Sequence, residues 1–250
     1  MKKLLIILLS FLSTGILIAQ DMKLDELLEK YYKAIGQDKS VKIQTFKITG
    51  KMSQRGGVVF QLISFNKRPD MERVEFDLQG TKLIVVFDGQ TGWMINPLGE
   101  SFEPQDMSAD QINSGKKLYG TQKIPFGWNN PLVNWKENGD KIELVGKEDI
   151  NGMPAYNIKM TFSDNEVVNY YMDIEKNLIL NSKEKSMIQG QIIDVETIYS
   201  DFRNVDSVLI PFKLETLYNG RSAAIITFDK VEINLPLDDA IFKKPAVNTN

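Results

Sequence analysis

Alternation of apolar and polar residues with a period of two runs through most of this chain, and it constrains the fold more than any other feature. Val74, Phe76 and Leu78 alternate with charged residues, and the same pattern recurs over residues 46–49, 156–162 and 212–218. Short glycine-containing turns such as Asn219-Gly220 separate the runs. Such a pattern predicts an antiparallel meander of about ten strands whose apolar face must be covered.

A different period precedes the first of these runs. Apolar residues three and four positions apart predict an amphipathic helix over residues 21–35, with Asp21 as its N-cap and Gly36 as its end. The apolar side of this helix consists of Leu24, Leu27, Leu28, Tyr31 and Ile35. The chain is therefore expected to be mainly β, with a small α component.

The alternation stops between residues 97 and 137, which predicts a helix-and-loop insertion. We expect one helix from Ser108 to Leu118 and the start of another from Pro131 to Glu137. An insertion of this length in a meander usually covers a functional face. The apolar side chains expected in this lid are Met107, Ile112, Leu118, Trp128 and Trp135.

The first twenty residues have the pattern of a secretory signal peptide. A basic head, Met1-Lys2-Lys3, precedes an apolar run that ends near Ala19. We expect cleavage near Ala19 or Gln20, a periplasmic location, and a single domain over residues 21–250. A permanent N-terminal anchor is the alternative.

Two residue types are missing from the sequence, and their absence narrows the chemistry. The chain has no Cys and no His, which excludes disulfides, His- or Cys-based nucleophile systems and the usual zinc sites. We expect no metal, no cofactor and no enzymatic activity, with a carboxylate-pair glycosidase as the enzymatic alternative. A net charge of −3 argues against nucleic acid as a partner.

Two short motifs resemble a known family. "KRPD" (residues 67–70), followed by a strand and then "DGQTGWMINP" (residues 88–97), is similar to the signature of the LolA/LolB-like periplasmic lipoprotein carriers. The resemblance extends to about Ile179. The stretch from Asp201 to Pro245 is longer than the tail of those carriers and is more similar to the wider set of LolA-like proteins.

The resemblance implies a strongly curved antiparallel sheet that forms an unclosed half-barrel around a hydrophobic cavity, with a few short helices as its cover. Arg68 matches the family arginine that holds the lid closed, and Trp93 is expected to line the cavity or to pack in the core. The complete expected lining is Val74, Phe76, Leu78, Trp93, Ile158, Met160, Phe162, Phe212 and Leu214.

The same resemblance implies a carrier for lipoprotein acyl chains or lipid, acting in outer-membrane lipoprotein sorting. Its partners would be a membrane-protein donor and acceptor that dock transiently, and the carrier would be a monomer. The alternative is an exported interaction or structural module, or an envelope-stress sensor, whose apolar faces are filled by its own side chains.

Overall fold

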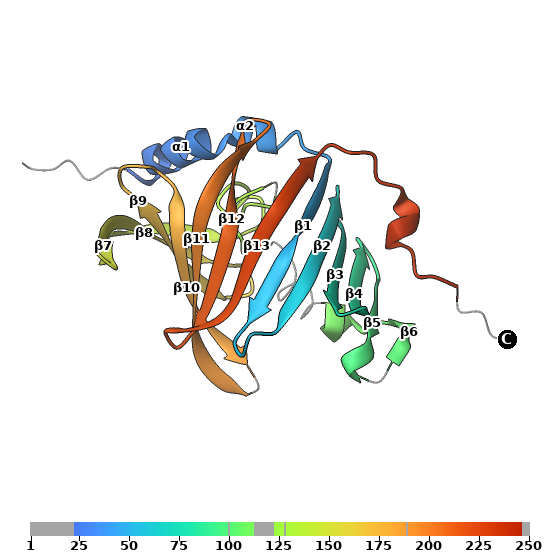
Figure 1. The fold of residues 1–250 in the computed structure, drawn as a ribbon. Helices are drawn as coiled ribbons and strands as arrows, with labels where there is room; N and C mark the ends of the chain where they lie inside the picture. Colours follow the sequence, from blue (N-terminus) through green and yellow to red (C-terminus); the bar gives the residue numbers. More distant parts are fainter. Residues whose placement is uncertain (1–22, 100, 113–122, 128, 189, 247–250) are drawn as a thin grey trace, which may run out of the picture.

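One antiparallel sheet of thirteen strands dominates the computed structural model (Figure 1). The structure describes residues 23–99, 101–112, 123–127, 129–188 and 190–246. Two helices precede the sheet, α1 (Leu24–Ile35) and α2 (Gln37–Ser40). The predicted mainly-β, curved and unclosed sheet is confirmed.

The sheet contains two meanders. The first consists of β1 (Thr45–Gln54), β2 (Val59–Lys67), β3 (Met71–Leu78), β4 (Thr81–Asp88), β5 (Gly92–Asn96) and β6 (Ser101–Asp106), with the 3₁₀ helix η1 (Pro97–Gly99) before β6. The second consists of β7 (Lys141–Ile150), β8 (Met153–Thr161), β9 (Val167–Asp173), β10 (Ile179–Ile188), β11 (Gln191–Val205), β12 (Val208–Tyr218) and β13 (Arg221–Ile233). A second 3₁₀ helix, η2 (Asp239–Phe242), follows β13.

The two meanders join where β1 pairs with β13, so the strand order is β6-β5-β4-β3-β2-β1-β13-β12-β11-β10-β9-β8-β7. The prediction of one continuous meander is wrong in this respect. Local turns fix the pairing of consecutive strands, whereas this seam needs the two ends of the chain to meet. Among the described strands, β6 and β7 form opposite edges, and the segment that joins them in sequence is the predicted insertion.

Glycine is required at the seam. The register between β1 and β13 shifts at Thr49/Gly50, and the two backbones come close together there. A Cβ placed on Gly50 would lie 2.2 Å from the carbonyl oxygen of Thr227. The close approach therefore excludes any side chain at this position.

Helix α1 lies across one end of the curved sheet (Figure 1). It ends at Gly36, which has the left-handed φ of 71° that the sequence predicted for a C-cap. Its first described turn follows Lys23, which makes no side-chain cap, and Asp21 lies outside the described residues. The buried face of α1 contacts the sheet through Leu27, Leu28, Tyr31 and Ile35.

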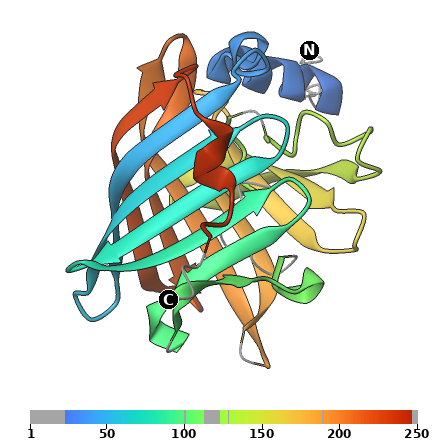
Figure 2. The same cartoon turned by 90° about the vertical axis from the view of Figure 1, so that its right-hand side faces the viewer.

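Apolar side chains fill both faces of β4. Ile84 and Val86 pack with Phe242 in a small cluster, and the side chains of Val85 and Phe87 are also buried. Burial on both faces explains why residues 83–87 are all apolar and do not alternate. The layer over one face is the C-terminal segment, drawn in red, which runs over the outside of the first meander (Figure 2).

Candidate ligand-binding site

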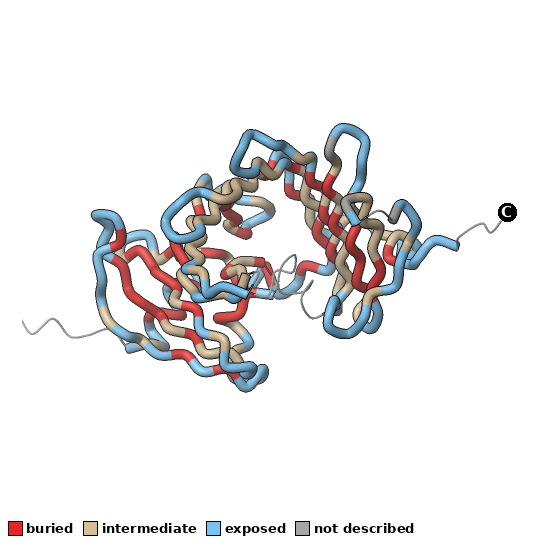
Figure 3. Tube along the Cα trace, turned by 90° about the horizontal axis from the view of Figure 1, so that it is seen from below, coloured by how far each residue is buried: buried red, intermediate tan, exposed pale blue. Residues whose placement is uncertain are grey.

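The inner face of the curved sheet forms one apolar wall. Figure 3 shows the curvature and the runs of buried residues along it. Six residues of the predicted lining lie buried in a single hydrophobic cluster, and Phe162 packs half-buried against it. The six are Val74, Phe76, Ile158, Met160, Phe212 and Leu214. Strands β3, β8 and β12, which lie in separate parts of the sheet, thus contribute to one surface.

Two other residues of the predicted lining differ from these. The side chain of Leu78 lies outside the described part. Trp93 belongs to the small outer cluster with Ile84, Val86 and Phe242, and its Nε1–H donates to the Phe242 carbonyl oxygen at 2.9 Å. Of the two alternatives for Trp93, packing in a core is therefore the one that the structure supports, and this core lies outside the inner wall. Trp93 pairs with Val86 across β4 and β5, and both side chains project to the face under the C-terminal segment.

That C-terminal segment is held to the outer face by polar contacts as well. The Lys67 ammonium donates to the Leu237 carbonyl oxygen at 2.9 Å, and the Arg73 guanidinium donates to the Ile241 carbonyl oxygen at 2.7 Å. The tail that departs from the motif resemblance thus completes a second small core.

The described parts of the insertion form a cover built mainly from turns. Residues 109–112 are helical, and Ser108 and Gln111 cap each other reciprocally: the Ser108 N–H donates to Gln111 Oε1 at 2.8 Å, and the Gln111 N–H donates to Ser108 Oγ at 3.2 Å. The helix start predicted at Ser108 is confirmed, while Leu118 and Trp128 lie outside the described residues. Met107 and Ile112 are half-buried at the edge of the wall, each 3.2 Å from a Cβ built on Gly92.

The helix predicted from Pro131 is absent, since residues 131–139 form turns and a bend. The segment begins at Asn130, whose side chain is buried. Its Oδ1 accepts from the Leu132 N–H at 3.1 Å, and its own carbonyl oxygen accepts from the Val133 N–H at 3.1 Å. These bonds resemble the start of a helix, but the following residues form separate turns instead. Trp135 is half-buried and packs against the main cluster.

Helix α1 holds the cover through two adjacent tyrosines. The Tyr31 hydroxyl donates to the Pro125 carbonyl oxygen and accepts from Asn130 Nδ2 at 2.9 Å. The Tyr32 hydroxyl donates to the Leu132 carbonyl oxygen. Burial raises the pKa of Tyr32 to about 12 and that of Tyr31 still further, so both hydroxyls stay protonated and can donate.

Lys123 connects the cover to the second meander. Its ammonium pairs with Glu166 Oε2 at 2.8 Å and with Glu184, and its carbonyl oxygen accepts from the Tyr170 hydroxyl at 2.8 Å. Burial alone lowers the pKa of Lys123, but the contacts with the two carboxylates outweigh burial and the net direction is upward. Lys123 is therefore charged at neutral pH, and it ties the cover to β9 and β10.

Arg68 makes a side-chain hydrogen bond to the segment that precedes β1. Its Nε–H donates to the Ile43 carbonyl oxygen at 2.7 Å, in the segment that joins α2 to β1. Because α1 and α2 directly precede this segment, Arg68 fixes the strand end next to the helices that hold the cover. Its assignment as the lid latch stays a prediction.

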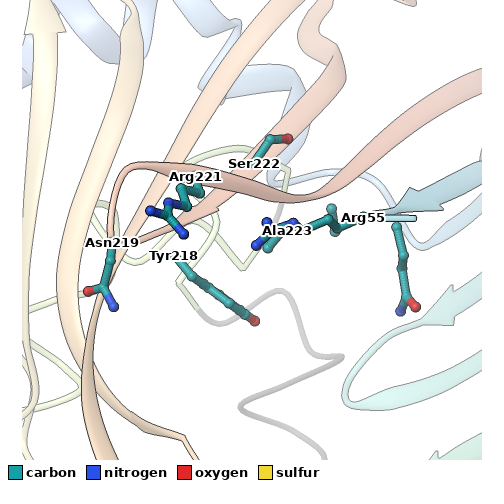
Figure 4. A pocket seen from close by; sticks show the side chains of 8 residues that line it. Arg55, Tyr218, Asn219, Arg221, Ser222 and Ala223 are labelled. Carbon is teal, nitrogen blue, oxygen red and sulfur yellow. The ribbon is translucent and has the colours of Figure 1, made fainter. Parts of the chain in front are cut away.

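The described residues line two hollows, one between the wall and the cover and one at an end of the sheet. A cavity of about 30 Å³ lies between wall residues such as Phe46 and Ile210 and cover residues Phe126 and Gly127. It has room for about one or two water molecules, so an acyl chain can enter this cavity only if Phe126 and Gly127 move away from the wall. A wider hollow of about 700 Å³ opens at the end of the sheet remote from α1, where the β1–β2 and β12–β13 turns meet (Figure 4).

Sequence reasoning missed most of the polar residues that hold the cover. Tyr31 was assigned to the apolar side of its helix, and neither Lys123 nor Asn130 belongs to a recognisable motif. The one usable signal was the adjacent pair Tyr31-Tyr32, because a phenol that is buried usually needs a partner for its hydroxyl.

This chain is similar to known proteins in its fold. No protein-family model matches the sequence, and no curated protein matches it. Solved structures do match: a DUF1329 family protein from Desulfovibrio piger has a TM-score of 0.57 at 14% identity, over 87% of this chain and 97% of that one. A LolA superfamily protein also matches over most of its length, so the fold is LolA-like.

Two further structures support the LolA-like fold. A LolA superfamily protein from Nitrosomonas europaea has a TM-score of 0.56 at 14% identity, over 89% of this chain and 98% of that one. A domain described as an outer membrane lipoprotein-sorting protein, from Vibrio parahaemolyticus, has a TM-score of 0.56 at 11% identity, over 87% and 97%. The TM-scores establish a shared LolA-like architecture. Sequence identities this low say nothing about the ligand.

Metal sites and membrane-spanning helices are both absent from the described residues. Within them, no three acidic side chains lie close enough together to hold a metal ion. Across the same stretches, no helix is long and apolar enough to cross a membrane.

Proposed function

We propose that this protein is a periplasmic carrier that binds an acyl chain of a lipoprotein or lipid between the inner wall and the cover. The proposal rests on one observation: the wall and the cover differ in structure and in the contacts that hold them in place. The wall is a continuous apolar surface assembled from both meanders, whereas the described part of the cover consists mainly of turns that polar contacts hold to α1 and to the second meander. A cover attached in this way can separate from the wall without unfolding the sheet.

The energetics suit reversible binding. Burial of an acyl chain of about 14–16 carbons gains roughly 0.8 kcal/mol per CH₂ group, or on the order of 10 kcal/mol per chain. Loss of translational freedom and the opening of the cover oppose this gain. The remaining affinity is moderate, as a carrier that must release its cargo requires.

Several parts of this proposal concern the cellular role. The N-terminal residues would act as a cleaved signal peptide, and the carrier would work as a monomer in outer-membrane lipoprotein sorting. A membrane-protein donor and acceptor would dock with it transiently. The LolA-like fold and the domain described as lipoprotein-sorting support this role.

Arg68 enters the proposal as an indirect latch. Its hydrogen bond to Ile43 fixes the segment that follows α1 and α2, and α1 carries the tyrosines that bind the cover. Loss of this bond would loosen the position of the helix relative to the wall. The cover would then open more often.

One observation favours a second function, that of an exported interaction module without a small ligand. The cavity between the wall and the described cover residues Phe126 and Gly127 is only about 30 Å³, which is too small for an acyl chain. The two functions differ in whether the cover opens to admit an acyl chain.

A fluorescent fatty-acid probe separates the two functions. The side chain of Phe76 is buried in the wall, and Phe76→Glu places a charge there; we expect probe affinity to fall by at least tenfold. Phe102→Glu is the matched control, because Phe102 on β6 is 72% exposed and should leave probe affinity unchanged. Failure of the unaltered protein to take up the probe would favour the interaction module.

A further inference from the structure

The hollow of about 700 Å³ at the open end of the sheet is lined by the ends of three strands and their turns. Its residues are Gln54, Arg55, Tyr218, Asn219, Arg221, Ser222, Ala223 and Ala224. The Arg55 N–H donates to the Ala223 carbonyl oxygen at 3.0 Å, which places the two turns side by side. Figure 4 shows the side chains of Arg55, Tyr218 and Arg221 around this hollow.

The charge of this lining is entirely positive, since it contains two arginines and no carboxylate. In the part of the chain that the structure describes, neither Arg55 nor Arg221 pairs with an acidic side chain. Arg73 and Arg203 do so, with Glu75 and Asp201 respectively. The hollow therefore offers two guanidinium groups whose donors are available to an anion from solution.

The hollow continues the apolar wall. Phe212 and Leu214 on β12 lie in the main cluster, and Tyr218 follows on the same face because side chains alternate along a strand. Arg221 is directly opposite Tyr218 in the β12–β13 register, so it shares that face. Met52 on β1 packs against the cluster, and Gln54 comes two residues later at the hollow. An apolar surface thus ends at a cationic rim.

We propose that this hollow binds the anionic headgroup of an amphiphile whose acyl chain lies along the inner wall. A guanidinium group presents paired donors that match the oxygens of a phosphate or a carboxylate, so two of them select an anionic headgroup over a neutral one. This inference rests on the proposed acyl-chain carrier function and specifies its ligand as an anionic lipid or acylated molecule.

The test compares two ligands with the same acyl chain, lysophosphatidic acid and monoacylglycerol, below the concentrations at which they form micelles. Each displaces a fluorescent fatty-acid probe from the unaltered protein and from an R55Q/R221Q variant. We expect the unaltered protein to prefer lysophosphatidic acid by about tenfold, given that exposed charge contacts contribute modestly. The variant should lose this preference and keep its affinity for monoacylglycerol.

A K230Q variant is the control for loss of a positive charge, because Lys230 is 65% exposed and lies outside the hollow; it should keep the preference. Retention of the preference in R55Q/R221Q would overturn the headgroup site while leaving the carrier function intact. If neither lysophosphatidic acid nor monoacylglycerol displaces the probe, the carrier function fails and the headgroup site fails with it.

Two further experiments test whether the hollow binds a free anion or a membrane surface instead of the headgroup of a single amphiphile. Inorganic phosphate that displaces lysophosphatidic acid at equal concentration would indicate a site for a free anion and overturn the proposal. Binding to phosphatidylglycerol vesicles that depends on Arg55 and Arg221, without any preference between the two soluble ligands, would indicate docking to a membrane surface and would also overturn it.

Discussion

Replacement of Tyr31 by Phe removes one hydroxyl and keeps the ring that packs in the core. The Tyr31 side chain is 1% exposed, and so is that of its partner Asn130. The substitution leaves the Pro125 carbonyl oxygen and the Asn130 amide without their hydrogen bonds to the phenol. A buried polar group that loses its partner costs about 1–3 kcal/mol, so the loss at these two groups should destabilise the closed cover by about 2–6 kcal/mol in Tyr31→Phe.

Two measurements locate this loss. Denaturant unfolding gives the global free energy of unfolding, and hydrogen exchange of residues 124–132 reports local opening of the cover. Tyr156→Phe is the control, because Tyr156 is buried and its hydroxyl has no hydrogen bond among the described residues. If Tyr31→Phe matches Tyr156→Phe to within about 0.5 kcal/mol, with equal exchange over 124–132, the tyrosine does not hold the cover.

Three further predictions address the remaining contacts of the site. Lys123→Met removes the ion pairs with two carboxylates and should speed probe dissociation several-fold at low salt; equal rates, or the same salt dependence as the unaltered protein, would remove Lys123 from this role. Arg68→Leu should leave the circular dichroism spectrum unchanged and increase hydrogen exchange over residues 124–132, and an unchanged exchange rate would contradict the indirect-latch idea. From neutral pH up to about pH 10, the unfolded tyrosine pKa, stability should be constant. It should then decline as pH rises toward the raised folded pKa values, by up to about 1.4 kcal/mol per pH unit for each tyrosine. Denaturant midpoints at pH 8 and 11 check this, and ionisation of the buried tyrosines near pH 10 without unfolding would contradict it. The tyrosines concerned are Tyr31, Tyr32, Tyr170, Tyr171 and Tyr199.

The inner wall was predictable because a strand with one buried face shows it as alternation. Val74 and Phe76 on β3 and Phe212 and Leu214 on β12 all lie in the cluster expected of them. Alternation divides residues between two faces but does not say which face a given strand turns inward. Trp93 is an example, because the outer face of β4 and β5 is buried too, under the C-terminal segment. No local sequence pattern predicts that this segment covers the outer face.

The seam and the cover depend on contacts between distant parts of the chain. Pairing of β1 with β13 joins residues 46 and 233, and no turn chemistry specifies it. Tyr31 reaches Pro125 across a sequence separation of 94 residues, and Lys123 reaches Glu184 across 61. The sequence could predict that a cover exists from the break in periodicity, but the residues that hold it could be found only in the folded structure.

Native mass spectrometry of the protein secreted by a bacterial host tests the central claim most directly. The account predicts an additional mass that organic extraction identifies as an acylated molecule, and loss of that mass in Phe76→Glu but not in Phe102→Glu. A protein that is secreted empty and that takes up no fluorescent fatty acid would contradict it. The inner wall would then be an ordinary core filled by its own side chains.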